Sequence, residues 1–308
     1  MDQLAAMRAF VQVVETGSFT RAAALLDMPK ATLTKHVQSL EGHLRTRLLN
    51  RTTRRVIVTP DGAAYYERAL VILADLAELD GSLSSAQAVP RGRLRIDISP
   101  SLATRILIPA LPEFFARHPD IMLDVGCTDR PVDLLGENVD CVIRVGEIQD
   151  PNLIARRIGE MHFVTVAAPS YIARHGMPAH PLELDECHHT LRYFSAQTGR
   201  SFPLEFERDG EELVVSGRYQ VATNDGNAYV AAGLEGLGIM VSPLFMVEDH
   251  VRSGALVPVL TDWSAGEMPV HVVYPPTRHL TSRLRVFVDW TAELFARLDL
   301  ARRLQSSE

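Results

Sequence analysis

The sequence predicts a mixed fold, part α+β and part α/β, in which an N-terminal winged helix-turn-helix precedes a long helix and a larger α/β region. Three observations support this prediction. Residues 1–60 hold three helical patterns separated by tight breaks, residues 62–85 hold one long helical pattern, and short apolar strands alternate with helices from Arg93 onward.

The first sixty residues have the layout of a helix-turn-helix. Gly17 predicts the end of the first helix, and Ser18 is a good N-cap for the second. The third helix follows Pro29, and its outer face would carry short hydroxyls and lysines, which suit phosphates and base edges in a major groove. The residues predicted to contact DNA from this helix are Lys30, Ala31, Thr32, Thr34 and Lys35.

A basic segment precedes the apolar run at residues 56–58 and predicts the wing. Its predicted DNA contacts are Arg51, Thr53, Arg54 and Arg55. Residues 1–60 hold nine Lys+Arg against four acids, a balance of +5, whereas the whole chain carries −7. The remaining 248 residues therefore carry −12, so a polyanion would meet the N-terminal end. A small helical bundle with a solvated basic face, or one that docks on a protein, remains an alternative.

The segment after the wing predicts one long helix from Pro60 to about Ser85, ended by a hinge at residues 84–92. Its apolar residues recur at intervals of four and three, the heptad pattern of a helix that packs on another helix. The predicted dimerisation residues are Tyr65, Ala69, Ile72, Leu76, Leu79 and Leu83. The alternative is an amphipathic helix lying on its own domain.

From Arg93 onward, strands and helices alternate in two sets, which predicts parallel sheets. The first set has strands near Ile96, Val125 and Ile143, with helices over residues 107–117 and 133–135 between them. The second set places strands at 218–223, 239–241 and 256–260, with helices at 227–234 and 244–253 between them. Two further apolar strands, 163–168 and 270–273, could cross between the two sets. The final helix, over 282–298, would pack on the first set.

The segment from Ala22 to Gly62 (AAALLDMPKATLTKHVQSLEGHLRTRLLNRTTRRVIVTPDG) resembles the DNA-binding signature of the LysR-type transcriptional regulators nearly position for position. A weaker resemblance continues through DRPVDLL, VDCVIRVGE and AAGLEGLGIMVSP. One departure is Pro29-Lys30, where the family usually has Ser-Gln. Proline suits the first turn of a helix, so the fold is expected to persist.

The resemblance implies a C-terminal effector-binding domain of two Rossmann-like lobes, similar to a periplasmic solute-binding protein. The expected domains are a winged helix-turn-helix at 1–61, a linker helix and hinge at 62–90, and an effector-binding domain at 91–303. Lobe I would comprise 91–163 and 267–303, and lobe II would comprise 164–266. The resemblance also implies homodimers or homotetramers on a double-stranded operator.

Ligands of open α/β sheets bind beyond the carboxyl ends of the strands. Hydroxyls and free backbone N–H groups gather at these positions and would suit an anionic metabolite. The same hydroxyls could instead cap helices, and Arg144 could be an interlobe ion-pair partner. The predicted effector-binding residues are Ser99, Ser101, Thr128, Arg144, Thr223 and Asn224.

The spacing of the remaining reactive residues matches no metal, cofactor or catalytic motif. Cys127, Cys141 and Cys187 include no CxxC pair, and Cys187-His188-His189 has no second ligand pair, so no metal site is predicted. No dinucleotide loop, Walker sequence or nucleophile elbow occurs, so neither a cofactor nor enzymatic activity is expected.

No signal peptide or membrane-spanning segment is evident, which predicts a cytoplasmic protein without membrane contact. The function predicted is transcription control by a homo-oligomer that binds a small effector. The rival is a cytoplasmic solute-binding or enzymatic α/β protein with a helical docking head, which would be insensitive to salt and would turn over a substrate.

Overall fold

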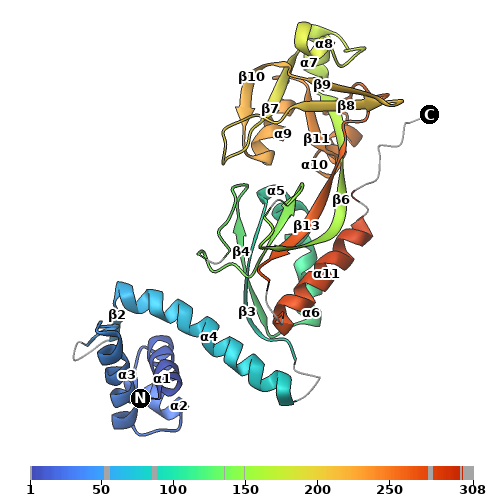
Figure 1. Ribbon diagram of the computed structural model, residues 1–308. Coiled ribbons are helices and arrows are strands. Elements are labelled where there is room, and N and C mark those ends of the chain that lie inside the picture. Colours follow the sequence, from blue (N-terminus) through green and yellow to red (C-terminus); the bar gives the residue numbers. More distant parts are fainter. Residues whose placement is uncertain are drawn as a thin grey trace. The chain divides into compact units, whose positions relative to one another are not determined.

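Figure 1 shows the computed structural model, which describes residues 2–51, 56–84, 89–134, 136–148, 150–276, 280–298 and 300. The chain divides into two compact units, Met1–Val89 and Pro90–Glu308. The first contains helices and one small hairpin, and the second contains mixed strands and helices. This element order agrees with the predicted fold class.

The N-terminal unit begins with three helices followed by a hairpin and a long helix. Its elements are α1 (Gln3–Thr16), α2 (Phe19–Leu25), α3 (Lys30–Leu44), β1 (Leu49–Arg51), β2 (Val56–Val58) and α4 (Pro60–Ser84). Gly17 ends α1 in the left-handed region at φ 61°, where glycine has no Cβ to clash. The Ser18 hydroxyl accepts the Arg21 N–H at 3.4 Å and caps α2. Both predicted boundary residues are in place.

The N-terminal core joins all four helices. Leu33, Val37 and Leu40 of α3 are fully buried against α1, whose Phe10 is also inaccessible to solvent. The start of α4 lies so close to the hairpin that a Cβ on Gly62 would stand 2.1 Å from the Leu48 carbonyl oxygen. Only glycine fits this approach.

Lobe I of the C-terminal unit is built around the predicted strand–helix alternation. Its elements are β3 (Gly92–Ile98), α5 (Pro100–Leu102), the π-helical turn η1 (Ala103–Leu107), α6 (Ile108–Arg117), β4 (Ile121–Cys127), β5 (Cys141–Val145), β6 (Ile154–Ala167), β13 (Glu267–Tyr274) and α11 (Ser282–Leu298). The helical segment starts at Pro100, seven residues before the predicted start, because the Ser99 hydroxyl caps its first turn.

Residue 133 has no regular structure and residues 134 and 136–138 form a turn, so the predicted helix there is wrong for the described residues. The Asp133 carboxylate accepts the Gly136 N–H at 3.0 Å, a local bond that favours a turn over a helix.

Lobe II contains the second predicted set, together with two helices, one strand and one hairpin that were not predicted. Its elements are α7 (Pro169–His175), α8 (Glu183–Glu186), β7 (His189–Tyr193), β8 (Leu204–Arg208), β9 (Glu211–Val215), β10 (Arg218–Thr223), α9 (Gly226–Leu234), β11 (Met240–Pro243), α10 (Leu244–Arg252) and β12 (Val257–Pro258). Strand β10 pairs with β7 in parallel, and β8 pairs with β9 antiparallel.

One strand belongs to both lobes. The main sheet has the order β11-β6-β13-β5-β3-β4, with β12 also paired to β6. Strand β3 is parallel to β4 and β5, as predicted, whereas β13 runs antiparallel to both of its neighbours. Residues 154–162 of β6 pair with β13, and residues 163–167 pair with β11 and β12 (Figure 1). The predicted crossing strand at 163–168 is thus the last part of a longer strand.

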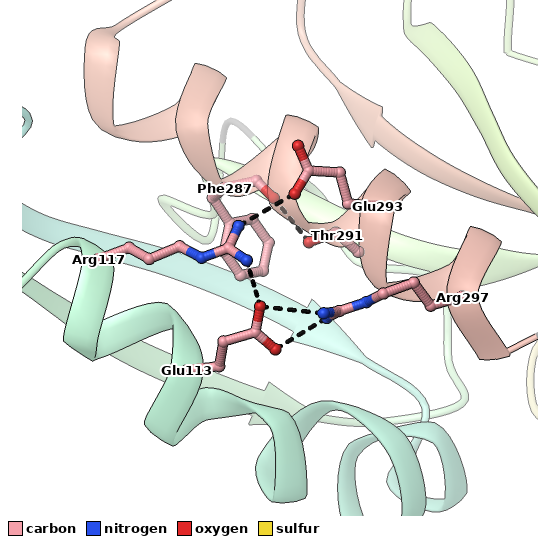
Figure 2. Close-up of polar contacts among 6 residues, drawn as sticks. All are labelled: Glu113, Arg117, Phe287, Thr291, Glu293 and Arg297. Carbon is pink, nitrogen blue, oxygen red and sulfur yellow. Dashed lines mark hydrogen bonds and ion pairs between the residues drawn. The ribbon is translucent and has the colours of Figure 1, made fainter.

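Helix α11 packs on lobe I, as predicted. Phe287 and Trp290 lie in its buried core against Phe114 of α6. At the surface, the Glu113 carboxylate accepts two hydrogen bonds from Arg297, at 2.8 and 3.1 Å, and one from Arg117 at 2.5 Å (Figure 2). These ion pairs tie α6 to α11.

We expect the Glu113 ion pairs to make thermal stability depend on pH. The hydrogen bond from Arg297 is the largest cause that lowers the pKa of Glu113. Ionised Glu113 therefore stabilises the fold above the ordinary glutamate pKa, and this stabilisation is lost as pH falls through the pKa of Glu113 in the folded protein. Glu113→Gln should lower the unfolding temperature modestly at pH 7, and this loss should shrink as pH falls through the folded pKa of Glu113.

Differential scanning calorimetry over this pH range, at low salt and at 1 M salt, measures the unfolding temperature, and 1 M salt should reduce the difference between variant and wild type. Glu248→Gln, which breaks an ion pair within one helix, is the control. A loss that stays the same at every pH would contradict the ion-pair explanation.

Candidate functional site

The exposed face of α3 carries the predicted DNA contacts. Lys30, Ala31, Thr32 and Lys35 are exposed and Thr34 is half-buried, whereas the opposite face of the helix is anchored in the core. Pro29 precedes the helix at φ −60° and ψ 136° and provides no side-chain cap. The side chain of Pro29 therefore caps none of the first backbone N–H groups of α3. Lys30 and Lys35 lie near this end of the helix.

Strands β1 and β2 form the antiparallel hairpin expected of a wing, with Arg51 opposite Val56. The Glu41 carboxylate accepts the N–H groups of Leu48 and Leu49 at 2.9 and 3.1 Å, which fixes the hairpin to α3. The predicted contacts Thr53, Arg54 and Arg55 lie outside the described residues, as does the side chain of Arg51. Their role stays a prediction.

The first part of the predicted dimerisation face packs within its own unit. Ala69 is 1% exposed, and the Tyr65 ring meets Phe10 of α1 edge-on at 5.6 Å. For Ala69 the expectation of a partner-facing surface is corrected, because the core of its own unit covers it. Tyr65 is half-buried and Ile72 is 48% exposed, while the side chains of Leu79 and Leu83 lie outside the described part. A dimer contact stays a prediction for Tyr65, Ile72 and the residues after it.

The predicted effector residues of lobe I lie together at the end of β3. The hydroxyl oxygens of Ser99 and Ser101 are 3.1 Å apart, and Ser101 is buried. A Cβ placed on Gly226 of lobe II would lie 3.4 Å from the Ser101 hydroxyl. Ser101 therefore reaches the lobe junction, which we define as the contact zone of Ser101, Asp129, Tyr193, Asn224 and Gly226.

Three predicted hydroxyls make local bonds to the backbone. Ser99 accepts the Leu102 N–H at 3.5 Å, Thr128 accepts the Arg130 N–H at 3.2 Å, and Thr223 accepts the Asp225 N–H at 3.1 Å. The helix-capping alternative thus describes Ser99, which caps α5, whereas Thr128 and Thr223 accept N–H groups of residues outside the helices. Each O–H proton remains able to donate elsewhere, since these bonds use the oxygen as acceptor.

Arg144 is paired within lobe I. Its guanidinium donates to Asp97 at 2.5 Å and to the Arg130 carbonyl at 3.3 Å. The side chain of Asp97 is 8% exposed and that of Arg144 is 18% exposed. The alternative of an interlobe ion pair is corrected, because Asp97 comes from β3, the neighbour of β5 in the sheet.

Sequence reasoning missed the polar contact between the lobes. The Tyr193 hydroxyl lies 3.1 Å from a carboxylate oxygen of Asp129 and 2.9 Å from the Asn224 carbonyl oxygen. Burial raises the pKa of Asp129, and the neighbouring charges of Asp225 and Asp97 add to this effect. Tyr193 and Asp129 are 64 positions apart, and nothing in the local pattern of either indicates that they meet.

Among the residues that the structure describes, no group of His, Cys, Asp and Glu is arranged to hold a metal ion. His188 is buried, and its Nδ1 lies 3.3 Å from the Tyr171 hydroxyl oxygen. The same hydroxyl accepts the backbone N–H of His189, so His188 and His189 both contact Tyr171 within lobe II. Within the same described part, no helix is both long and apolar enough to cross a bilayer.

Two family models match the chain. Residues 4–63 match the bacterial regulatory helix-turn-helix of the lysR family, and residues 87–296 match the LysR substrate binding domain. The chain belongs to the LysR family of transcriptional regulators. The family predicted from the sequence is therefore confirmed, and so is the expectation that this LysR-type regulator is not an enzyme.

Several relatives match nearly the whole LysR-type chain. An HTH-type transcriptional repressor of Pseudomonas aeruginosa is 41% identical over 96% of this chain and 93% of its own length. The transcriptional activator AaeR of Escherichia coli is 31% identical over 96% and 94%. The structure of CrgA, a LysR-type regulator of Neisseria meningitidis, is similar with a TM-score of 0.59 at 31% identity, covering 94% of this chain and 98% of that one. The relatives include both a repressor and an activator.

Proposed function

We propose that this LysR-type regulator binds a double-stranded operator through α3 and the wing, and that a small effector bound between its two lobes modulates transcription. The observation that carries the proposal is the face of α3 that exposes two lysines while the opposite face packs in the core. The second unit of the same chain matches the substrate-binding domain of the family. Lysines on a helix face suit phosphate contacts, which position a protein on DNA.

We propose the following organisation for the regulator. The winged helix-turn-helix comprises residues 1–61, the linker helix and hinge 62–90, and the effector-binding domain 91–303, with lobe II at 164–266. Two or four chains assemble and present their N-terminal units to a pseudo-palindromic operator in the cytoplasm. The half-exposed Ile72 on α4 supports a contact between chains, because an apolar side chain of this size gains stability when covered.

We further propose that the effector is anionic. Ser101 at the lobe junction, with Ser99 and Thr128 beside it, offers hydroxyl donors, which supports the predicted anionic molecule. Arg144 is already engaged by Asp97, so an anion would share or displace that carboxylate. Effector screens should therefore include neutral and cationic molecules beside carboxylates.

The experiment that tests the proposed function is genome-wide capture of DNA by the full chain in cells. We expect enrichment of a few sites located in promoters, and loss of that enrichment for the double variant Lys30→Ala/Lys35→Ala. Equal enrichment by both proteins, or sites scattered without relation to promoters, would reject the proposal.

Effector binding should depend on the hydroxyls of Ser101 in the lobe junction and of Thr128 beside it. Ser101→Ala and Thr128→Ala should each weaken the best effector from a thermal-shift screen by roughly 2- to 100-fold, because one hydrogen bond contributes about 0.5–3 kcal/mol depending on the charge of the ligand group. Isothermal titration calorimetry measures this change. Operator binding without effector should stay at the wild-type level.

Thr104→Ala is the matched control, because the Thr104 hydroxyl is exposed and donates to the Pro100 carbonyl of its own helix at 3.0 Å. Unchanged affinity in both junction variants would place the effector elsewhere. Loss of operator binding in these variants would instead mean that the hydroxyls serve the fold.

A further inference from the structure

Strand β7 of lobe II carries a buried arginine that has no acidic partner among the described residues. Arg192 is 7% exposed, and its Nη1 donates to the Phe202 carbonyl oxygen at 3.0 Å. Its Nε is buried and meets no acceptor, and no carboxylate of the residues that the structure describes forms an ion pair with the guanidinium. Arginine is almost never buried without a counter-charge, because a buried cation loses the hydration that stabilises it in water.

Arg192 lies on the face of β7 that is turned away from the lobe junction. Side chains alternate between the two faces of a strand. Tyr193, the next residue, packs edge-on against Tyr229 of α9 and reaches Asp129 at the junction. On the opposite face, the guanidinium carbon of Arg192 lies 5.8 Å from the centre of the Tyr219 ring of β10. An anion bound there would therefore not occupy the proposed effector site.

The groups described around Arg192 do not supply the missing negative charge. The Phe202 carbonyl is neutral and accepts one of the five N–H groups of the guanidinium. Burial raises the pKa of Tyr229, the charge of Arg192 lowers it less, and the phenol stays protonated at neutral pH. An arginine that only ties Phe202 to β7 would need the Nη1 bond alone. The edge formed by Nε and Nη2 has no acceptor among the described residues, and an oxyanion fits such an edge.

We propose that Arg192 is the centre of an oxyanion site in lobe II, separate from the lobe junction, which takes a carboxylate or phosphate group. Two oxygens of the group accept parallel N–H bonds from Nε and Nη2, the planar geometry in which arginine binds both classes of anion. Tyr219 is 54% exposed and lies over the guanidinium, so its rotation opens the path to the buried Nε. The site goes beyond the proposed function and does not rest on it.

Isothermal titration calorimetry of the full chain, without DNA, tests the site. Sodium phosphate and sodium acetate are titrated separately at one ionic strength, which is set with sodium chloride. At least one oxyanion should bind the wild type saturably, and the one that binds more tightly identifies the ligand class. Arg192→Gln should weaken that binding by about 10- to 150-fold, because hydrogen bonds from a charged donor are lost. Arg192→Lys keeps the charge but not the planar fork, and should weaken the binding by about tenfold.

Two controls separate this site from other anion contacts, and circular dichroism checks that each variant is folded. Arg174→Gln removes an exposed arginine of lobe II that also donates to a carbonyl, that of Gly236 at 2.8 Å, and should keep the wild-type affinity. Ser101→Ala alters the lobe junction and should keep it as well. If Arg192→Gln fails to fold, Arg192→Lys decides. No saturable binding of either oxyanion by the wild type, wild-type affinity in the folded Arg192 variants, or a loss in Ser101→Ala alone would overturn the site.

Discussion

Replacing Lys30 and Lys35 together by alanine should weaken operator binding by about 100-fold at low salt, because two charge-assisted contacts to phosphates are lost. Both side chains are exposed on α3, whose buried face holds the helix in place, so the fold should be unaffected. The slope of log affinity against log salt should also fall by about 2, one for each phosphate contact. Fluorescence anisotropy with an operator duplex at several salt concentrations measures both quantities.

The matched control for charge is Arg252→Ala, which removes a cation from an exposed site on α10 in the other unit. Its affinity and salt slope should equal those of the wild type. If the lysine variant keeps the wild-type slope as well, α3 does not contact phosphates and another face of the N-terminal unit binds the operator.

Ile72→Glu should dissociate the oligomer. The side chain is 48% exposed on α4 in the single chain, so a glutamate there is tolerated in the monomer but would be buried at a contact between chains. Burying an unpaired carboxylate costs roughly several kcal/mol, enough to raise the dissociation constant by about 100-fold or more. Sedimentation velocity over a range of concentrations measures the change. Leu25→Glu, at a 66% exposed position on α2, controls for the added charge.

A wild-type oligomer in Ile72→Glu at every concentration would show that α4 does not hold the chains together through this residue. Ala69 would be a poor choice for the same test. Because Ala69 lies in the core of its own unit, Ala69→Glu would unfold the domain, and the loss of oligomer would not report on the contact between chains.

Local signals in the sequence predicted the N-terminal unit well. Gly17 and Ser18 act through bonds to neighbours within a few positions, and such bonds follow from residue type alone. The same reasoning should have found the β8–β9 hairpin, since Asp209-Gly210 takes positive φ values between two alternating strands.

Other features were beyond the sequence because they depend on which surfaces meet. The heptad spacing of α4 identified apolar residues, but it did not show that Ala69 would be buried in its own unit and that Tyr65 would pack on Phe10 of α1. Polar groups at strand ends were placed near one another by the topology. Side-chain packing in three dimensions decides whether Arg144 meets Asp97 or a ligand. It also decides that Tyr193 reaches Asp129.

Strand β13 has a consequence for biosynthesis. It lies between β6 and β5 in the sheet of lobe I, yet it follows all of lobe II in the chain. While a ribosome is still translating residues 164–266, β5 therefore has an unpaired edge and the core of lobe I lacks Val270, Val272 and all of α11. Lobe II can be completed first, although lobe I is begun first. A chain truncated before Glu267 would carry two incomplete strand edges in lobe I, a form prone to aggregate.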